Sequence, residues 1–282
     1  CFSPASPFRR WPGAPRRSRG APRHPTLPRG GGGAAAVRPP KGTAWGSPLA
    51  ARAGETAAGI PEHDAALAMW RELGDVDELA SALDSLGWSL VYDFTDNARA
   101  LEAFEQSLEL RRELGDAAGA TRALVGIAQV LVATGETERA ELIAHDLLDR
   151  AAGDARTEHF AYHFLADCAL IRGNSEQAGT RYRQSLRAAL PLGDVVEASF
   201  EVQGVAMSEA ATGNPHRALV LAGSVEALWE SLGVSFSIGF WNALLERYLA
   251  PARASLADEY DAVSAEGRAL AFDDAVELAL RD

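Results

Sequence analysis

A six-residue segment that recurs at a nearly fixed interval constrains the fold of this chain more than any other feature. The copy at 213–218 reads Gly-Asn-Pro-His-Arg-Ala, and related copies occupy 173–178, 135–140 and 95–100. Their closing alanines stand at positions 100, 140, 178 and 218, so the spacings are 40, 38 and 40 residues. A second motif, usually Leu-Gly-Asp, alternates with the first, with its glycines at positions 74, 115, 153, 193 and 233. Two interleaved motifs that share one period predict an array of helical hairpins.

The residue types inside the repeated segment fit a turn between two helices. The glycine that opens most copies suits a left-handed backbone at a helix end, where other residues suffer a Cβ clash. The next position holds Asp96, Asn174 or Asn214, whose side-chain oxygens can cap the following helix. Glu136 stands there in the remaining copy, which predicts a weaker cap. The closing alanine predicts a close approach of paired helices, where a larger side chain would cost roughly 1–3 kcal/mol.

The repeat register predicts the helices and the division of the chain. We expect one unpaired helix over 61–73, followed by four complete hairpins. The hairpin helices are predicted at 77–92 and 98–114, 117–133 and 137–151, 156–172 and 175–190, and 195–212 and 215–232. Two shorter helices, 238–250 and 252–264, are predicted on either side of Pro251, and a last amphipathic helix begins at Asp273. The predicted units are a segment over 1–54, repeats over 55–234 and C-terminal capping helices over 235–282.

The segment 1–54 differs sharply in composition from the rest of the chain. It holds ten of the 14 prolines, ten Lys and Arg residues and no Asp or Glu. Without apolar periodicity it cannot bury enough surface to fold, so we expect it to be disordered. A nucleic-acid-binding arm, an organelle transit peptide and a leader that is not native to the protein are the alternative interpretations. A twin-arginine export signal lacks the apolar stretch that should follow it.

Charge and cysteine content limit which partners and which cellular compartment we expect. The other residues hold 17 Lys and Arg and all 39 acids, a net charge of −22 that repels phosphate. We therefore expect no direct nucleic-acid binding by the repeats. The two cysteines, Cys1 and Cys168, indicate no disulfide framework and favour a cytoplasmic protein. We expect no membrane span, because no apolar run approaches the roughly 18 residues that a span needs. A first residue that is Cys1 rather than Met suggests a partial or processed chain.

Two further positions recur inside the predicted hairpins. A large residue followed by a small one precedes the turn in every first helix: Leu86-Gly87, Ile127-Ala128, Leu165-Ala166 and Val205-Ala206. An aromatic, Phe104 or Tyr182, stands four residues after the alanine in two of the second helices. Together with the turn glycine and the cap, this pattern resembles the tetratricopeptide-repeat family, with about 40 residues per repeat instead of 34.

The longer repeat is similar to the MalT-like type found in large bacterial ATP-dependent regulators, including LuxR-type transcription regulators. The tail from Glu266 to Leu280 is similar to the end of their repeat region, and the resemblance covers 61–282. It implies an all-α solenoid that serves as a non-catalytic interaction or scaffold module. Those regulators also carry a nucleotide-binding module and often a helix-turn-helix, but no G-x-x-x-x-G-K-[ST] motif occurs here.

The resemblance also implies where a partner binds. In tetratricopeptide arrays the first helices line a concave groove, and the corresponding positions here are Asp84, Trp88, Arg122, Gln129, His163, Asp167, Gln203 and Met207. Polar, aromatic and methionine side chains suit a protein or peptide partner. The alternative is a small-molecule effector in the groove or in a pocket between helices. At the other end, Leu67, Trp70 and Leu73 give 61–73 an apolar face, for which we expect an upstream domain or a second copy.

One histidine pair raises the question of a metal site. His159, His163 and Asp167 are spaced at i, i+4 and i+8, so a helix places them on one face near Cys168. A metal site needs three or four converging ligands, and no second helix offers an obvious partner. We therefore expect no metal there. The sequence assembles no Ser/His/Asp or Cys/His set, so we also expect no catalytic residues and no cofactor.

Overall fold

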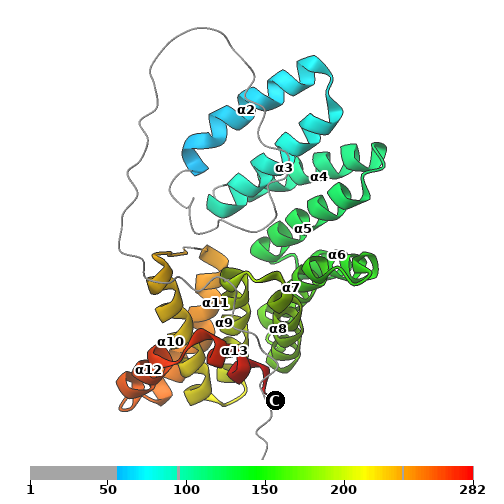
Figure 1. The fold of residues 1–282 in the computed structure, drawn as a ribbon. Helices are drawn as coiled ribbons and strands as arrows, with labels where there is room; N and C mark the ends of the chain where they lie inside the picture. Colours follow the sequence, from blue (N-terminus) through cyan, green and yellow to red (C-terminus); the bar gives the residue numbers. More distant parts are fainter. Residues whose placement is uncertain (1–55, 94–95, 237, 282) are drawn as a thin grey trace, which may run out of the picture.

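A computed structural model describes residues 56–93, 96–236 and 238–281, all of them in helices or in the connections between helices (Figure 1). No strand occurs among these residues, so the predicted all-α fold class is confirmed for the described part of the chain. The predictions made for 1–54 lie outside the described residues.

The repeat register predicted the helix boundaries closely. The described chain begins in α2 (Thr56–Leu73), which starts five residues earlier than predicted. Four hairpins follow: α3 (Val76–Asp93) with α4 (Asn97–Glu113), α5 (Ala117–Thr134) with α6 (Thr137–Ala151), α7 (Ala155–Ile171) with α8 (Ser175–Ala189), and α9 (Val195–Ala211) with α10 (Pro215–Leu232). Every boundary of these eight helices lies within one residue of the prediction, and a short 3₁₀ helix, η1 (Leu190–Leu192), continues α8.

The hairpins stack along the chain in Figure 1, since each helix packs against the next. The first helices of the hairpins, α3, α5, α7 and α9, also contact one another in succession. They therefore form a continuous surface, which we call the inner face. α9 lies deepest, because all twelve residues from Ala198 to Glu209 are buried. A helix buried on every side is covered by more than its hairpin partner and its neighbour.

The turns follow the predicted chemistry with one exception. The three predicted turn glycines have left-handed backbones, with φ of 79° at Gly135, 81° at Gly173 and 91° at Gly213. Asp96 and Asn174 accept hydrogen bonds from backbone N–H groups in the first turn of the next helix, and Glu136 makes no such bond. The predicted cap at Asn214 is wrong. Its amide nitrogen instead donates to Glu209 Oε2 (2.9 Å), because this buried carboxylate lies next to the turn.

The repeating alanines lie where the hairpins close. Ala100, Ala140, Ala178 and Ala218 have no exposed surface, as the spacing predicted. Ala178 also lies in the same core cluster as the aromatic side chain four residues later, Tyr182. A larger side chain at these positions has no free volume to occupy.

We expect Ala178→Leu to lower the free energy of unfolding by about 1–3 kcal/mol, because three added carbons must displace packed neighbours. Urea denaturation followed by circular dichroism measures this change. Glu176→Ala, an exposed position in the first turn of the same helix, is the control and should change stability little. Equal, small effects of the two substitutions would contradict the assigned hairpin contact.

Large and small side chains are matched between neighbouring hairpins. The buried ring of Phe104 in α4 lies between Gly87 of α3 and Gly126 of α5. A Cβ atom would lie 2.7 Å from this ring at Gly87 and 2.5 Å from it at Gly126, so neither glycine can be enlarged without moving the ring. Gly204 of α9 makes the same room for Tyr182, at 2.4 Å.

The junction between the second and third hairpins reverses this arrangement. The position equivalent to Phe104 and Tyr182 is the fully buried Ala144 in α6. The following helix, α7, carries the fully buried Phe164 where α5 and α9 carry glycine. The space that the small Ala144 leaves in α6 is therefore filled by the large Phe164 of α7.

The C-terminal helices correct one prediction. They are α11 (Gly239–Ser255), α12 (Tyr260–Ala269) and α13 (Phe272–Leu280), and α11 continues through Pro251 instead of ending there. An interior proline costs a helix roughly 3 kcal/mol. Leu249 and Ala252 are both buried in core clusters, so packing on either side of the proline outweighs that cost.

The last two helices pack on the outer side of the final hairpins. α12 lies along α10, where a Cβ on Gly267 would come within 2.4 Å of the Val220 carbonyl oxygen. α13 contacts α8, α9 and α10. Arg183 and Arg217 donate to the carbonyls of Ala279 (2.9 Å) and Leu278 (2.8 Å), so cations bind the negative end of the α13 dipole.

One helix departs from the expectation about membrane spans. By length and composition alone, α5 is apolar enough to cross a membrane, over its 18 residues. Of that stretch 61% is buried inside the fold, and core helices pass the same test, so this is weak evidence for a membrane span.

Candidate functional site

Helix α11 covers the C-terminal half of the inner face. Trp241, only 2% exposed, stacks on the His163 ring of α7, with 6.0 Å between ring centroids and 28° between planes. Its indole N–H donates to Gln203 Oε1 of α9 (2.8 Å). The indole also lies edge-on to Tyr182 of α8, at 6.3 Å. Trp241 therefore contacts three helices of two neighbouring hairpins.

The other end of α11 binds the C-terminal end of α7. The hydroxyl of Tyr248 donates to the Leu170 carbonyl (2.6 Å), and Arg247 donates to the Ile171 carbonyl (3.2 Å). Carbonyls in the last turn of a helix lack intrahelical partners and carry partial negative charge. α11 is thus fixed at two points about two helical turns apart.

A cluster of buried ionisable side chains lies beneath Trp241. We call His163, Asp167, Tyr182 and Glu201 the His163 cluster. His163 Nδ1 lies 2.7 Å from Glu201 Oε1, and its Nε2 lies 3.4 Å from Asp167 Oδ2. The Tyr182 hydroxyl donates to Asp167 Oδ1 (2.6 Å). Three helices therefore contribute to one buried polar network.

The cluster changes the protonation of its members. Burial alone would lower the pKa of His163, but the carboxylates of Asp167 and Glu201 outweigh it and raise that pKa to about 10. His163 is therefore an imidazolium at neutral pH. Burial raises the pKa of Asp167 to about 6, although His163 and the Tyr182 hydroxyl act in the opposite direction. Asp167 thus titrates in the range where most carboxyl groups are fully ionised.

The cluster is incompletely hydrogen-bonded. Asp167 Oδ2 and Glu201 Oε2 are buried without a hydrogen-bond partner, as is His159 Nε2 next to the cluster. The nearest acid to this last atom is Glu197 Oε2, at 3.7 Å. Buried polar atoms without partners cost roughly 1–3 kcal/mol each. The packing of α11 on this region therefore retains an electrostatic cost.

The four predicted groove residues of α7 and α9 do not line an open surface. Asp167 and Met207 have no exposed surface, and Gln203 is 4% exposed. The His163 side chain is 13% exposed beneath Trp241. The prediction of an open groove is wrong at these positions, because α11 and the core cover them. His163 and Gln203 nonetheless contact a helix, which here belongs to the same chain.

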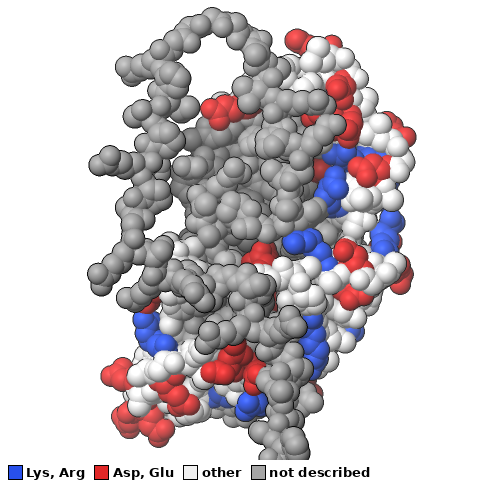
Figure 2. All heavy atoms as spheres, viewed as in Figure 1, with Lys and Arg blue, Asp and Glu red and all other residues white. Residues whose placement is uncertain are grey.

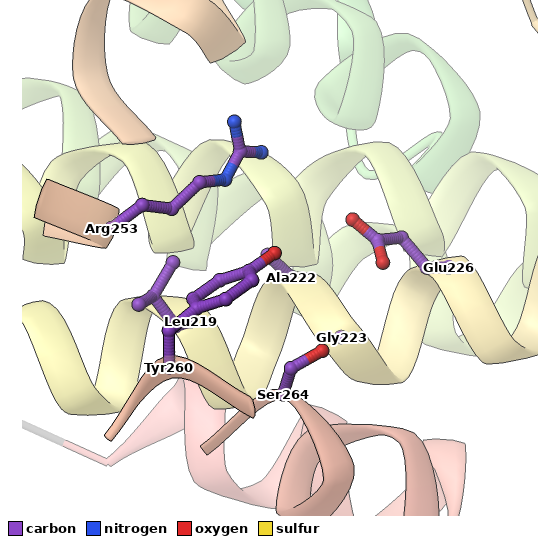
Figure 3. Close-up of a pocket in the computed structure, with 7 residues that line it drawn as sticks. All are labelled: Leu219, Ala222, Gly223, Glu226, Arg253, Tyr260 and Ser264. Atoms are coloured by element: carbon purple, nitrogen blue, oxygen red, sulfur yellow. The ribbon is translucent and has the colours of Figure 1, made fainter. Parts of the chain in front are cut away.

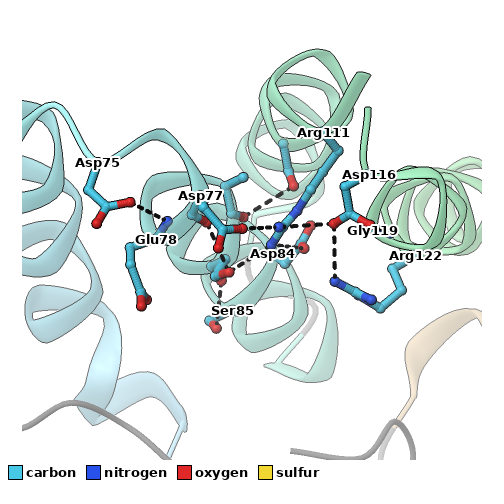
Figure 4. A network of polar contacts seen from close by, with 12 residues as sticks. Asp75, Asp77, Glu78, Asp84, Ser85, Arg111, Asp116, Gly119 and Arg122 are labelled. Atoms are coloured by element: carbon cyan, nitrogen blue, oxygen red, sulfur yellow. Dashed lines mark hydrogen bonds and ion pairs between the residues drawn. The ribbon is translucent and has the colours of Figure 1, made fainter. Parts of the chain in front are cut away.

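The structure brings together two of the four predicted residues on α3 and α5 (Figure 4). Arg111 of α4 is 3% exposed and contacts Asp77 at 2.6 Å, Asp116 at 3.1 Å and Asp84 at 3.7 Å. Arg122 lies 3.9 Å from Asp116. Asp84 and Arg122 therefore belong to one charge network at the junction of two hairpins. Burial raises the pKa of Asp84.

The other two predicted residues on these helices are half-buried. Trp88 lies edge-on to Phe104, with ring centroids 5.3 Å apart, so part of its ring belongs to the core. Gln129 is half-buried on α5. The side chains of Arg122 and Asp84 keep 35% and 16% of their surface exposed. The α3 and α5 part of the inner face thus offers polar and aromatic surface.

Sequence reasoning missed two central residues of this site. Glu201 lies in the stretch Ala-Ser-Phe-Glu-Val at 198–202, and an acid inside an apolar run is a signal of a buried, paired charge. Trp241 had been assigned only to a capping helix. Its contact with His163 joins residues 78 positions apart, which no local pattern predicts.

A pocket between α10, α11 and α12 tests the small-molecule alternative (Figure 3). Its volume of about 10 Å³ corresponds to about one water molecule. The lining residues are Leu219, Ala222, Gly223, Glu226, Arg253, Tyr260 and Ser264. This pocket does not support an effector site, because a small-molecule site needs several hundred Å³.

Among the described residues, α2 packs against α3 and keeps part of its apolar surface exposed. Leu67 is 4% exposed and Trp70 is half-buried, while Leu73 is 65% and Met69 37% exposed. α3 covers part of the apolar face that the sequence predicted. The upstream domain or second copy at this end stays a prediction.

Acidic and basic side chains alternate on the face shown in Figure 2. Ion pairs between exposed side chains join Arg139 with Glu136 at 2.7 Å and Arg150 with Asp146 at 2.8 Å. The described residues contain no group of three or more His, Cys, Asp or Glu side chains that could hold a metal ion.

Comparison with known proteins adds no family. No family model matches the chain, and no curated protein matches it.

Proposed function

We propose that this chain is a non-catalytic interaction module that binds a protein or peptide on its inner face. The observation that supports the proposal is the docking of α11 on α7 and α9. His163 and Gln203, two positions that the resemblance to tetratricopeptide arrays assigns to a binding groove, both contact Trp241. The positions that should recognise a partner therefore already hold a helix.

We further propose that the array is a tetratricopeptide-type solenoid with MalT-like repeats. The turn glycines, the buried alanines and the row of first helices support this assignment. By the same resemblance, the chain is the repeat region of a cytoplasmic bacterial signalling ATPase or transcription regulator. The sensor alternative, in which the array binds an effector, gains no support from the small pocket at α10.

The contacts of α11 indicate what kind of partner fits. The inner face accepts an aromatic side chain at one end and a donor pair, Arg247 and Tyr248, at the other. The part formed by α3 and α5 adds Trp88 and the network around Arg111. A helical segment with an aromatic anchor, extended towards α3, has complementary chemistry.

A peptide of residues 239–255 tests whether the inner face binds helices in trans. The full chain with Trp241→Ala and Tyr248→Ala loses both anchors of its own α11, which should free the face. We expect the labelled peptide to bind this variant with a micromolar Kd, measured by fluorescence anisotropy. Adding Gln203→Ala should weaken binding about three- to tenfold, because one buried hydrogen bond is lost.

The matched control is Leu142→Ala in the same background. Leu142 is 73% exposed on α6, away from the inner face, so its replacement should leave the Kd unchanged. Absence of peptide binding, or binding insensitive to Gln203→Ala, would refute recognition by this face.

A further inference from the structure

Helix α11 packs through Trp241 on the buried, ionisable His163 cluster, a feature that the interaction proposal does not require. Trp241 lies against His163 and Tyr182, the two residues that contact Asp167. Its single N–H donates to Gln203, so Trp241 offers no hydrogen-bond donor to Asp167, whose Oδ2 lies 3.4 Å from His163 Nε2 without a hydrogen bond. Trp241 therefore covers the two partners of this carboxyl group with an apolar ring.

The charge balance of the cluster depends on one proton. With Asp167 protonated, the imidazolium of His163 faces the single carboxylate of Glu201, and the cluster is neutral. With Asp167 ionised, two carboxylates share one imidazolium, and the cluster holds a net negative charge. An ionised carboxylate is strongly stabilised by water, and removal of Trp241 from His163 and Tyr182 would open the cluster to water.

We propose that α11 is a pH-dependent latch on the inner face, held more tightly when Asp167 is protonated and released more readily when Asp167 is ionised. The inference concerns α11 itself and stands whether or not the face binds a partner. Its consequence is that acidification keeps the positions around His163 and Gln203 covered.

The surroundings of Asp167 determine the direction of the effect. The groups that act on Asp167 are His163 on α7, Tyr182 on α8 and Glu201 on α9. One contact further away, His159 of α7 lies near Glu197 and Glu201 of α9. Arg247 of α11 donates to the Ile171 carbonyl, and Glu138 and Glu141 of α6 act on the neighbouring Cys168. With α11 packed on the cluster, burial raises the pKa of Asp167 from its ordinary 3.8 to about 6. A raised pKa stabilises the docked state at low pH, and this contribution is lost as the pH rises through about 6.

Hydrogen exchange on the full chain tests the latch. Protection factors of the amides in α11 should fall about tenfold between pH 5 and pH 7.5. Between pH 5 and the pKa of about 6, release of α11 is accompanied by loss of one proton from Asp167, which changes the equilibrium tenfold per pH unit. The amides of α6 should keep their protection. Asp167→Asn, which retains the acceptor for Tyr182, should remove the pH dependence and keep α11 protected at both pH values.

Two further variants separate the latch from general instability. Asp146→Asn, an exposed acid on α6, should show the pH dependence of the unmodified chain. Trp241→Ala should leave α11 poorly protected at both pH values while α6 stays protected. Protection of α11 that is independent of pH in the unmodified chain, or that always changes together with α6, would overturn the proposal. So would an Asp167→Asn chain that keeps the full pH dependence.

Discussion

Replacing His163 with alanine is expected to lower the free energy of unfolding by about 3–5 kcal/mol at pH 7, the cost of leaving buried charge without its partner. The side chain is 13% exposed and lies between Glu201 and Asp167, whose own side chains are 1% and 0% exposed. Without the imidazolium, two carboxyl groups remain buried with only the Tyr182 hydroxyl as a donor. Urea denaturation at pH 7, followed by circular dichroism, measures the loss.

The pH dependence distinguishes lost charge from lost packing. The pKa of His163 is raised to about 10, so its stabilising effect is complete below its ordinary value of 6.5 and is lost as the pH rises through about 10. The difference between the unmodified chain and the variant should therefore shrink above pH 10. His216→Ala is the control, because His216 and Glu266 form an exposed pair worth little. An equal loss at pH 7 and above pH 10 would mean that His163 acts only through its volume.

Phe104→Ala is expected to destabilise the chain by about 3–5 kcal/mol, the usual cost of removing a buried phenylalanine ring. The ring is fully buried, contacts Trp88, and fills the space left by Gly87 and Gly126. Its loss leaves a cavity that the two glycines cannot fill, because they carry no side chain. Thermal unfolding or urea denaturation measures the effect.

A second substitution tests whether the matched sizes matter. In the Phe104→Ala background, Gly126→Phe recreates the arrangement of Ala144 and Phe164 and should restore part of the lost stability. Gly126→Phe alone should be destabilising, because its Cβ would lie 2.5 Å from the ring of Phe104. If the double variant were less stable than either single variant, the matching between hairpins would not hold.

The sequence was sufficient for the helices but not for what covers them. Two repeating motifs predicted the boundaries of α3 to α10, because turn glycines and buried alanines depend only on local geometry and on the adjacent helix. The same pattern gave no reason for α11 to continue past Pro251. That outcome depends on Leu249 and Ala252 packing on helices distant in sequence.

For the candidate site, the sequence predicted which residues share one face, but it did not predict that another helix buries them. Repeat register correctly placed His163 and Gln203 on one face, since the register defines which side of each first helix points inward. It assumed that this face is open, and a helix from the same chain covers it instead. Asp167 and Glu201 lie on different helices, and their common contact with His163 follows from the packing of α7 on α9, which no local spacing predicts.

The alternation of large and small residues between hairpins also limits how the array could be shortened or rearranged. Excising α5 and α6 would bring Phe104 opposite Phe164, two aromatic rings where the fold provides room for one. Excising the four helices α5 to α8 would place Phe104 opposite Gly204, an adjacency of the kind already present at Gly126. The hairpins are therefore not interchangeable modules. Their order follows a size rule at each junction, in which a ring on one helix faces a glycine or alanine on its neighbour, and excising one hairpin at this junction breaks that rule.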